Sequence, residues 1–209
     1  MIFAILFEIF VYANFCGLSL IIYAIFGVLG VRVPLNFKQP FSSNNLIDFW
    51  KGWHISLSTV LKTLFYEPIR KRYGVGLAIL GVYLASAMWH GVTLNFLLWG
   101  LFHAACFYAT LFFLKRKIAL LPPFILIVGV VVGRLIFSDS NTERLIDKLK
   151  FVYRDFQAVE GVLELGGSIK LSIALMVLFV LFEIVLKIAD YLKKGTTNFI
   201  DYQLYSLFF

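Results

Sequence analysis

Residues 74–114 of the 209-residue chain read GVGLAILGVYLASAMWHGVTLNFLLWGLFHAACFYATLFFL. A helix needs about 20 apolar residues to cross the roughly 30 Å hydrocarbon core of a bilayer. This stretch is long enough for two such spans, residues 74–90 and 92–114, which only Gly91 separates. Because the chain must turn or break at Gly91, the stretch predicts two adjacent membrane helices.

The composition places the whole chain in the same class. Hydrophobic residues make up 61% of the chain and charged residues 15%. In soluble domains about 45–50% of the residues are apolar and about 25% are charged. A water-soluble enzyme, a disordered chain, a collagen-like repeat and a disulfide scaffold are therefore excluded. The fold class that we predict is an all-α polytopic membrane protein. Its 19 Lys and Arg residues lie between apolar stretches, so we interpret them as topology signals and expect no nucleic acid partner.

Three further apolar stretches extend the pattern on both sides. They are residues 1–31, 118–137 and 171–192. The first is too long for one straight span, and Tyr12, Asn14 and Gly17 are its expected interruptions. It has no Lys or Arg before Arg32, so we interpret it as a retained span rather than a cleaved signal peptide. Together these stretches predict about five transmembrane helices in a single membrane domain, residues 1–209.

Charged residues indicate the orientation of the spans. Residues 32–72 carry seven basic and two acidic side chains, and further basic clusters follow at 115–117 and 193–194. If these clusters are cytoplasmic, the later spans alternate and residues 138–169 form an outer loop, as the positive-inside rule requires. The first span would then begin outside, and residues 204–209 turn apolar again. We therefore expect the chain to be part of a longer membrane protein.

Residues 34–73 are too long and too aromatic for an ordinary connection. A polar cluster at residues 42–45, followed by Asp48, is typical of a helix start. Apolar residues then recur at i+3 or i+4, which predicts an amphipathic helix that lies in the interface or dips into the protein. These residues are Leu46, Phe49, Trp50, Trp53, Leu57, Val60, Leu61 and Leu64. His54 follows Trp53, so we expect aromatic side chains to flank it.

Histidines at membrane depth are candidate functional residues, because an ionisable group is costly to place there. His90 is the better candidate, since Gly91 beside it permits a helix break or a close approach of the backbone. His103 lies deep in the next span, and we interpret it as a packing residue. No short-spaced ligand pair exists among the histidines, so we expect no metal site. Glu183 and Lys187, four residues apart in the last span, are expected to neutralise each other.

Two stretches resemble the bacterial branch of the membrane-bound O-acyltransferase family. Asn36-Phe37 and Pro40, followed by DFWKGWHISLS at residues 48–58, resemble its signature N-F-x-x-P followed by D-F-W-R-R-W-H-I-S-L-S. WHG at residues 89–91, then Asn95, Trp99-Gly100 and His103, resemble its second signature, W-H-G followed by W-G-x-x-H. The branch includes alginate and peptidoglycan O-acetyltransferases and the teichoic-acid D-alanylation protein. The similarity covers residue 12 to about residue 107, and the chain resembles the family's C-terminal half.

The resemblance implies a ring of helices around a tunnel, with His90 as the catalytic histidine and His54 as a second, supporting one. The predicted substrate-binding residues are Asn36, Trp50, Trp53, Ser56, Trp89 and Asn95. It also implies transfer of an acyl group, in the first place acetyl, to a hydroxyl of an exported polysaccharide or cell-wall polymer. The donor would be a cytoplasmic acyl-coenzyme A or acyl-carrier thioester, with no bound cofactor. The setting would be the lipid bilayer of a bacterial inner membrane, with a secreted or anchored esterase-like acyltransferase as partner.

Two other interpretations stay open at this point. The chain could be a non-catalytic fragment, or one half of a split acyltransferase whose N-terminal half is separately encoded. Lys51-Gly52 stands where the family has a basic pair, and Thr63 stands where an aspartate is common, which favours these interpretations. A small transporter or channel would favour repeated spans, and the sequence has no internal repeat.

Overall fold

The computed structural model describes residues 2–138, 141, 143–145, 147 and 167–193, and every regular element among them is helical. The long helices are α1 (Ile2–Val28), α4 (Glu67–His90), α5 (Leu94–Lys115), α6 (Leu121–Phe137) and α9 (Gly167–Lys193). The short ones are α2 (Leu46–Gly52), α3 (Ile55–Leu61), a 3-10 helix (Pro40–Ser42) and a π-helical turn (Lys62–Tyr66). This confirms the all-α prediction. Most of the predicted outer loop, residues 138–169, and residues 196–209 lie outside the described residues.

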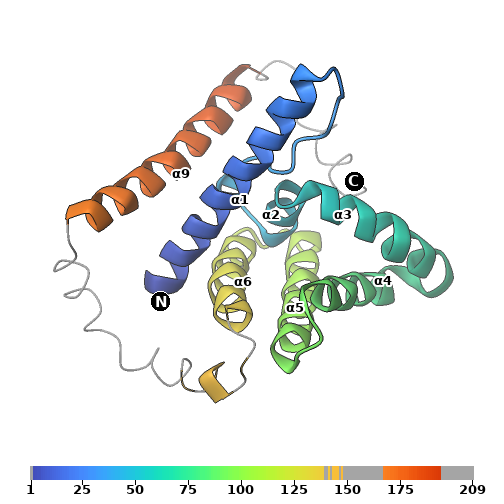
Figure 1. The fold of residues 1–209 in the computed structure, drawn as a ribbon. Helices are drawn as coiled ribbons and strands as arrows, with labels where there is room; N and C mark the ends of the chain where they lie inside the picture. The colour runs from blue at the N-terminus through green and yellow to red at the C-terminus, as the bar shows by residue number, and fades with distance from the viewer. Residues whose placement is uncertain (1, 139–140, 142, 146, 148–166, 194–209) are drawn as a thin grey trace.

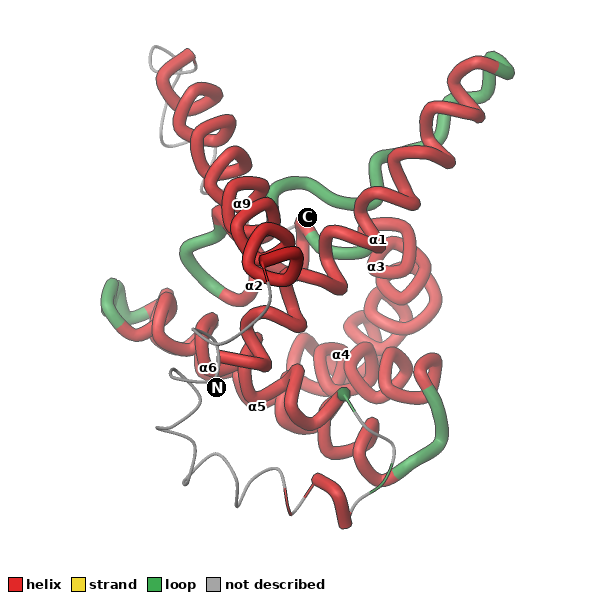
Figure 2. Tube along the Cα trace, turned by 60° about the vertical axis from the view of Figure 1, so that its left-hand side comes forward, coloured by secondary structure: helices red, strands yellow, loops and turns green. Residues whose placement is uncertain are grey.

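The helices form two groups with α2 between them (Figures 1 and 2). One group is α4, α5 and α6, in which α5 packs against both of its neighbours. The other is α1 with α9, and α1 also contacts α6. The two hydrophobic clusters meet at α2, because Phe49 and Trp53 belong to the cluster on α1 while Trp50 contacts the cluster formed by α4 and α5.

Three helical stretches are long and apolar enough to cross a bilayer: Ile5–Val28, Ile55–His90 and Leu94–Lys115. The predicted fourth span corresponds to the shorter apolar helix Leu121–Phe137, which begins with two prolines. The predicted fifth span lies within α9, a helix of 27 residues. Hydropathy in the sequence therefore located these helices, but the second apolar stretch begins at Ile55 and not at residue 74 as predicted, with a kink at Gly74.

The expected interruption of the first span is wrong, because α1 is continuous from Ile2 to Val28. The Asn14 side chain donates a hydrogen bond to the Phe10 carbonyl one turn earlier, at 2.9 Å. Tyr12 is buried against the core. A polar residue in an apolar helix needs no break when its hydrogen bonds are made within the helix or its side chain packs inward.

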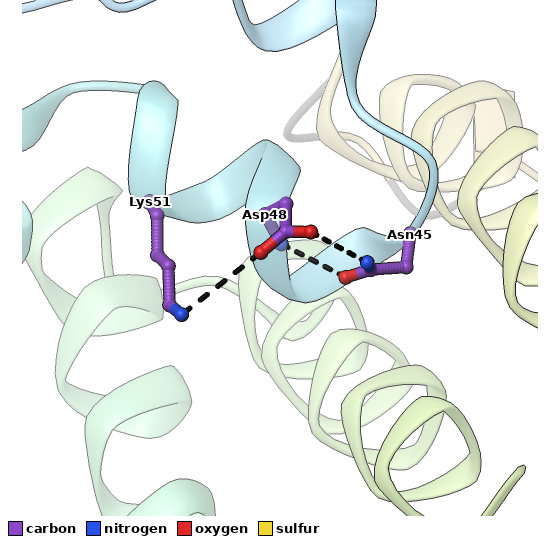
Figure 3. Close-up of polar contacts among 3 residues, drawn as sticks. All are labelled: Asn45, Asp48 and Lys51. Atoms are coloured by element: carbon purple, nitrogen blue, oxygen red, sulfur yellow. Dashed lines mark hydrogen bonds and ion pairs between the residues drawn. The ribbon is translucent and has the colours of Figure 1, made fainter. Parts of the chain in front are cut away.

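The predicted helix start at residue 45 is confirmed. The Asn45 side-chain oxygen accepts a hydrogen bond from the Asp48 backbone N–H at 3.0 Å, which caps α2. Its amide nitrogen donates to the Asp48 carboxylate at 2.6 Å, and the Lys51 ammonium lies 3.9 Å from the same carboxylate (Figure 3). These contacts fix the first turn of α2 with the residues that the sequence pattern indicated.

The prediction of one continuous amphipathic helix is wrong. α2 ends at Gly52, and His54 adopts a left-handed backbone conformation with φ of +47° before α3 begins. Residues 36–38 run alongside the break, where the Lys38 N–H donates to the Gly52 carbonyl at 2.8 Å and the Ile55 N–H donates to the Asn36 carbonyl at 2.9 Å. These bonds satisfy backbone groups that a continuous helix would have paired internally.

Gly52 is required by this packing, which gives a structural reason for its departure from the family pattern. A Cβ at Gly52 would lie 2.5 Å from the Lys38 carbonyl oxygen, a backbone atom that cannot turn aside. We therefore expect Gly52→Ala to lower the free energy of unfolding by about 1–3 kcal/mol. Thermal unfolding in detergent measures this loss, with Gly27→Ala as the matched control, since a Cβ at Gly27 meets nothing within 4 Å. Equal stability of the two variants would contradict the prediction.

α9 is joined to the loop before α2 through Lys187. The Lys187 ammonium donates to the Ser42 carbonyl at 2.6 Å. The Glu183 side chain is buried one turn earlier on α9. The neutralisation of Glu183 by Lys187 stays a prediction, since the Lys187 ammonium contacts a distant segment instead.

Candidate active site

His54 lies at the break between α2 and α3, where Asn36 holds it. The Asn36 side-chain oxygen accepts hydrogen bonds from the Ser56 backbone N–H at 3.1 Å and the Ser56 hydroxyl at 2.9 Å. The same oxygen lies 3.2 Å from His54 Nδ1. The Asn36 amide nitrogen donates to the Ser19 hydroxyl of α1 at 3.3 Å. The structure thus brings three predicted site residues, Asn36, His54 and Ser56, into one network.

This network assigns the tautomer of His54. The Asn36 atom that faces Nδ1 must be the oxygen, because the Ser56 backbone N–H can only donate. Nδ1 of the neutral imidazole therefore carries the proton, and Nε2 keeps a free lone pair. Burial lowers the pKa of the His54 imidazole below its ordinary value of 6.5, so the neutral form dominates at neutral pH. The Phe15 ring meets the imidazole edge-on, with the ring centres 4.7 Å apart.

His90 is the last residue of α4, and the predicted break at Gly91 is confirmed. Gly91 has a φ of +149°, a conformation that other residues rarely adopt. Thr93 then caps α5 by accepting a hydrogen bond from the Phe96 N–H. The His90 side chain is exposed and lies among three aromatic rings. Their centres are 4.7 Å away for Phe137, 5.8 Å for Trp99 and 6.0 Å for Phe96.

His103 lies one layer deeper and is 2% exposed. Its ring packs between Trp99 at 4.6 Å and Trp50 at 5.1 Å. A Cβ at Gly133 of α6 would lie 2.4 Å from His103 Nε2, so α6 covers the other side. This position agrees with the packing role predicted for His103. Trp50 therefore contacts His103 and not His54. The aromatic side chain that flanks His54 is Phe15.

The remaining predicted residues are spread over different surroundings. Trp53 is buried in the cluster with Tyr12 and Phe37. Asn95 is fully buried in α5, whereas Trp89 is 69% exposed beside His90. Trp89 can therefore meet a ligand at the surface, while Asn95 can act only on a group that enters the protein.

A buried pair of opposite charges lies near His90. Arg134 of α6 lies over the Phe137 ring, which contacts the His90 imidazole. Arg134 forms an ion pair with Glu8 of α1, and both side chains are largely buried. The sequence reasoning missed this pair, although a charged residue inside each apolar stretch was a usable signal. Within the described residues, no group of three His, Cys, Asp or Glu side chains could hold a metal ion.

The comparison with known protein families shows to which family the chain belongs. The model of the membrane-bound O-acyltransferase family matches residues 1–133, which include His54 and His90. The chain belongs to this family. With its apolar helices, family membership makes it a multi-pass membrane protein.

Curated relatives of known name match about half of the chain. A peptidoglycan O-acetyltransferase of Helicobacter pylori is 34% identical over 98 residues, which are 45% of this chain and 18% of the relative. A probable alginate O-acetylase of Pseudomonas syringae is 33% identical over 96 residues, 44% of this chain and 18% of the relative. A teichoic acid D-alanyltransferase of Bacillus subtilis is 26% identical over 120 residues, which are 52% of this chain and 30% of the relative. The chain thus covers less than a third of each of these relatives. No solved structure matches the chain.

Proposed function

We propose that the chain is the catalytic part of a membrane O-acyltransferase that modifies an exported polysaccharide or cell-wall polymer. The observation that carries this proposal is the pair of imidazoles, one exposed at a helix break and one fixed by Asn36. The names of the relatives support the same chemistry, since they describe acetylation of peptidoglycan, acetylation of alginate and D-alanylation of teichoic acid.

In the proposed reaction His90 acts as the general base. Its neutral imidazole takes the proton of the acceptor hydroxyl, whose oxygen attacks the carbonyl carbon of a thioester. The new C–O bond replaces the C–S bond, and the leaving thiolate receives the proton back from the imidazolium. No covalent enzyme intermediate is needed when donor and acceptor meet directly. The aromatic rings around His90 cover part of its imidazole and so limit the approach of water, which would compete as acceptor.

His54 is proposed to act on the donor. Because its Nδ1–H faces Asn36, its free Nε2 suits accepting a hydrogen bond from an amide N–H of the donor, or a proton. Polarising a carbonyl would need the imidazolium, which burial disfavours. Asn36 and Ser56 then position His54, instead of binding the substrate themselves as the sequence predicted.

The charge pattern supports an orientation for this reaction. We propose that the basic segments lie in the cytoplasm of a bacterial cell, where acyl-coenzyme A or an acyl-carrier thioester is available. His54 lies within the first basic segment, residues 32–72, and His90 lies at the end of the next span. The donor would therefore enter at His54, and the acceptor would meet His90 at the outer face. A secreted or anchored esterase-like acyltransferase is the proposed partner that continues the transfer.

A second candidate is one half of a split enzyme. Met88, Trp89 and Val92 beside His90 are 68%, 69% and 91% exposed, so further protein could cover this side of the site. A separately encoded N-terminal half would supply that cover. In this case the chemistry is unchanged, and the chain is inactive without the other half.

The experiment is an acylation assay of surface glycans in a deletion strain. The strain is complemented by an empty vector, by this chain alone, and by this chain with its upstream neighbour. Rescue by the chain alone supports a complete transferase, and rescue only with the neighbour supports the split enzyme. Absence of rescue in both arms, with normal amounts of protein in the membrane, would overturn the proposed function and favour a non-catalytic fragment.

A further inference from the structure

The last turn of α6 carries the charged partner of Glu8. Arg134 Nε contacts Glu8 Oε2, and the two side chains are 11% and 6% exposed. The residues are 126 positions apart, so the pair joins α6 to α1. A buried ion pair contributes little net stability compared with apolar packing of the same volume. A reason other than stability is therefore needed for a charge at this place.

The guanidinium group also lies over an aromatic ring that touches the candidate base. Its central carbon is 5.1 Å from the centre of the Phe137 ring, one turn further along α6. Phe137 meets the His90 imidazole edge-on, with ring centres 4.7 Å apart and planes at 83°. A continuous series of contacts thus leads from Glu8 through Arg134 and Phe137 to His90.

His90 depends on this support because little else fixes its side chain. It is the final residue of α4, beside a glycine, and its side chain is exposed. Among the described residues, no hydrogen bond orients its imidazole, which is held by aromatic contacts alone. Phe137 is the nearest of these rings, so its position decides where the imidazole nitrogens point.

We propose that Arg134 is a positioning residue that, pinned by Glu8, holds the Phe137 ring against His90 and so orients the imidazole toward the acceptor hydroxyl. This inference rests on the proposed function of His90. A simple staple between α1 and α6 would need the ion pair but not the ring beneath the guanidinium. Arg suits the role because its planar group can pair with a carboxylate and lie over a ring at once.

The test compares Arg134→Gln, Phe137→Leu and the double variant in membranes that also contain the upstream neighbour, with labelled acetyl-coenzyme A as donor. Each single change is expected to lower kcat about tenfold to a hundredfold. KM for the donor is expected to change less than about twofold, because the loss is confined to the chemical step. The double variant should be no slower than the slower single one, since Arg134 acts through Phe137.

The matched control is Arg116→Gln, which removes a guanidinium 4.5 Å from the centre of the Phe112 ring at the end of α5. It is expected to leave kcat unchanged. A second readout is the rate at which diethyl pyrocarbonate modifies His90, measured by mass spectrometry. Loss of the Phe137 contact should uncover more of the imidazole and speed this modification in Arg134→Gln and Phe137→Leu, but not in Arg116→Gln.

Additive losses in the double variant, or an unchanged kcat in Phe137→Leu, would overturn the inference. If Arg134→Gln fails to accumulate in the membrane, Phe137→Leu decides the question, because it leaves the ion pair intact. If the unchanged chain transfers no acyl group, the proposed function has failed. The modification rate then still tests whether Arg134 and Phe137 hold His90.

Discussion

His90→Ala is expected to lower acyl transfer by about 10²–10⁴-fold, while the amount of protein in the membrane stays normal. The size of the loss follows from the role of a general base, which removes the hydroxyl proton in the transition state. Stability should change little, because the His90 side chain is exposed. Acylation of surface glycans in the complemented deletion strain measures the loss.

Met88→Ala is the matched control for His90→Ala. Met88 lies in the same last turn of α4 and is 68% exposed, but it has no group that can accept a proton. Its truncation is expected to leave transfer within about twofold of the unchanged chain, as surface changes usually do. Equal activity of His90→Ala and Met88→Ala would refute a catalytic role for His90.

Local signals in the sequence were enough to find His90 and its helix break. The apolar run up to Gly91 predicted the span, and a glycine at that place predicted the break that its φ of +149° confirms. The helix start at Asn45 was predictable for the same reason, since a capping residue acts within one turn. In each case the decisive interaction joins residues that are neighbours along the chain.

Features that depend on distant segments could not be predicted in the same way. The break before His54 exists because residues 36–38 bond to the backbone at Gly52 and Ile55, while the apolar spacing alone favoured one long helix. The contacts of Asn36 with His54 and Ser56 could not be foreseen for the same reason. The Glu8–Arg134 pair joins residues that only folding brings together. Hydropathy and spacing describe single helices, and most of the site is made where helices meet.

The second large effect is expected for His54→Gln, which should lower transfer by about a hundredfold or more. Gln keeps a polar side chain of similar length, but it cannot take up a proton. Asn36→Ala should lower transfer less, because it leaves the imidazole present but free to change tautomer. Ser58→Ala is the control on α3, since among the described residues the Ser58 hydroxyl bonds only to the Trp53 carbonyl, at 3.4 Å. Loss of transfer in Ser58→Ala as large as in His54→Gln would indicate damage to α3 rather than to a reacting group.

The pH dependence tests whether the proposed reaction needs neutral imidazoles. Burial disfavours the imidazolium, so the pKa of His54 in the folded protein lies below 6.5. The neutral form needed at Nε2 is therefore present above that pKa and is lost as the pH falls through it. We expect the rate of the unchanged chain to be level near pH 7 and to decline at a pH below 6.5, measured in sealed membranes with buffered donor. In Asn36→Ala the network that orients Nδ1 is gone. We therefore expect its level rate near pH 7 to be lower than that of the unchanged chain. A rate that keeps rising from pH 7 to pH 8 would show that a group with a higher pKa controls the reaction, and His54 would lose its proposed role.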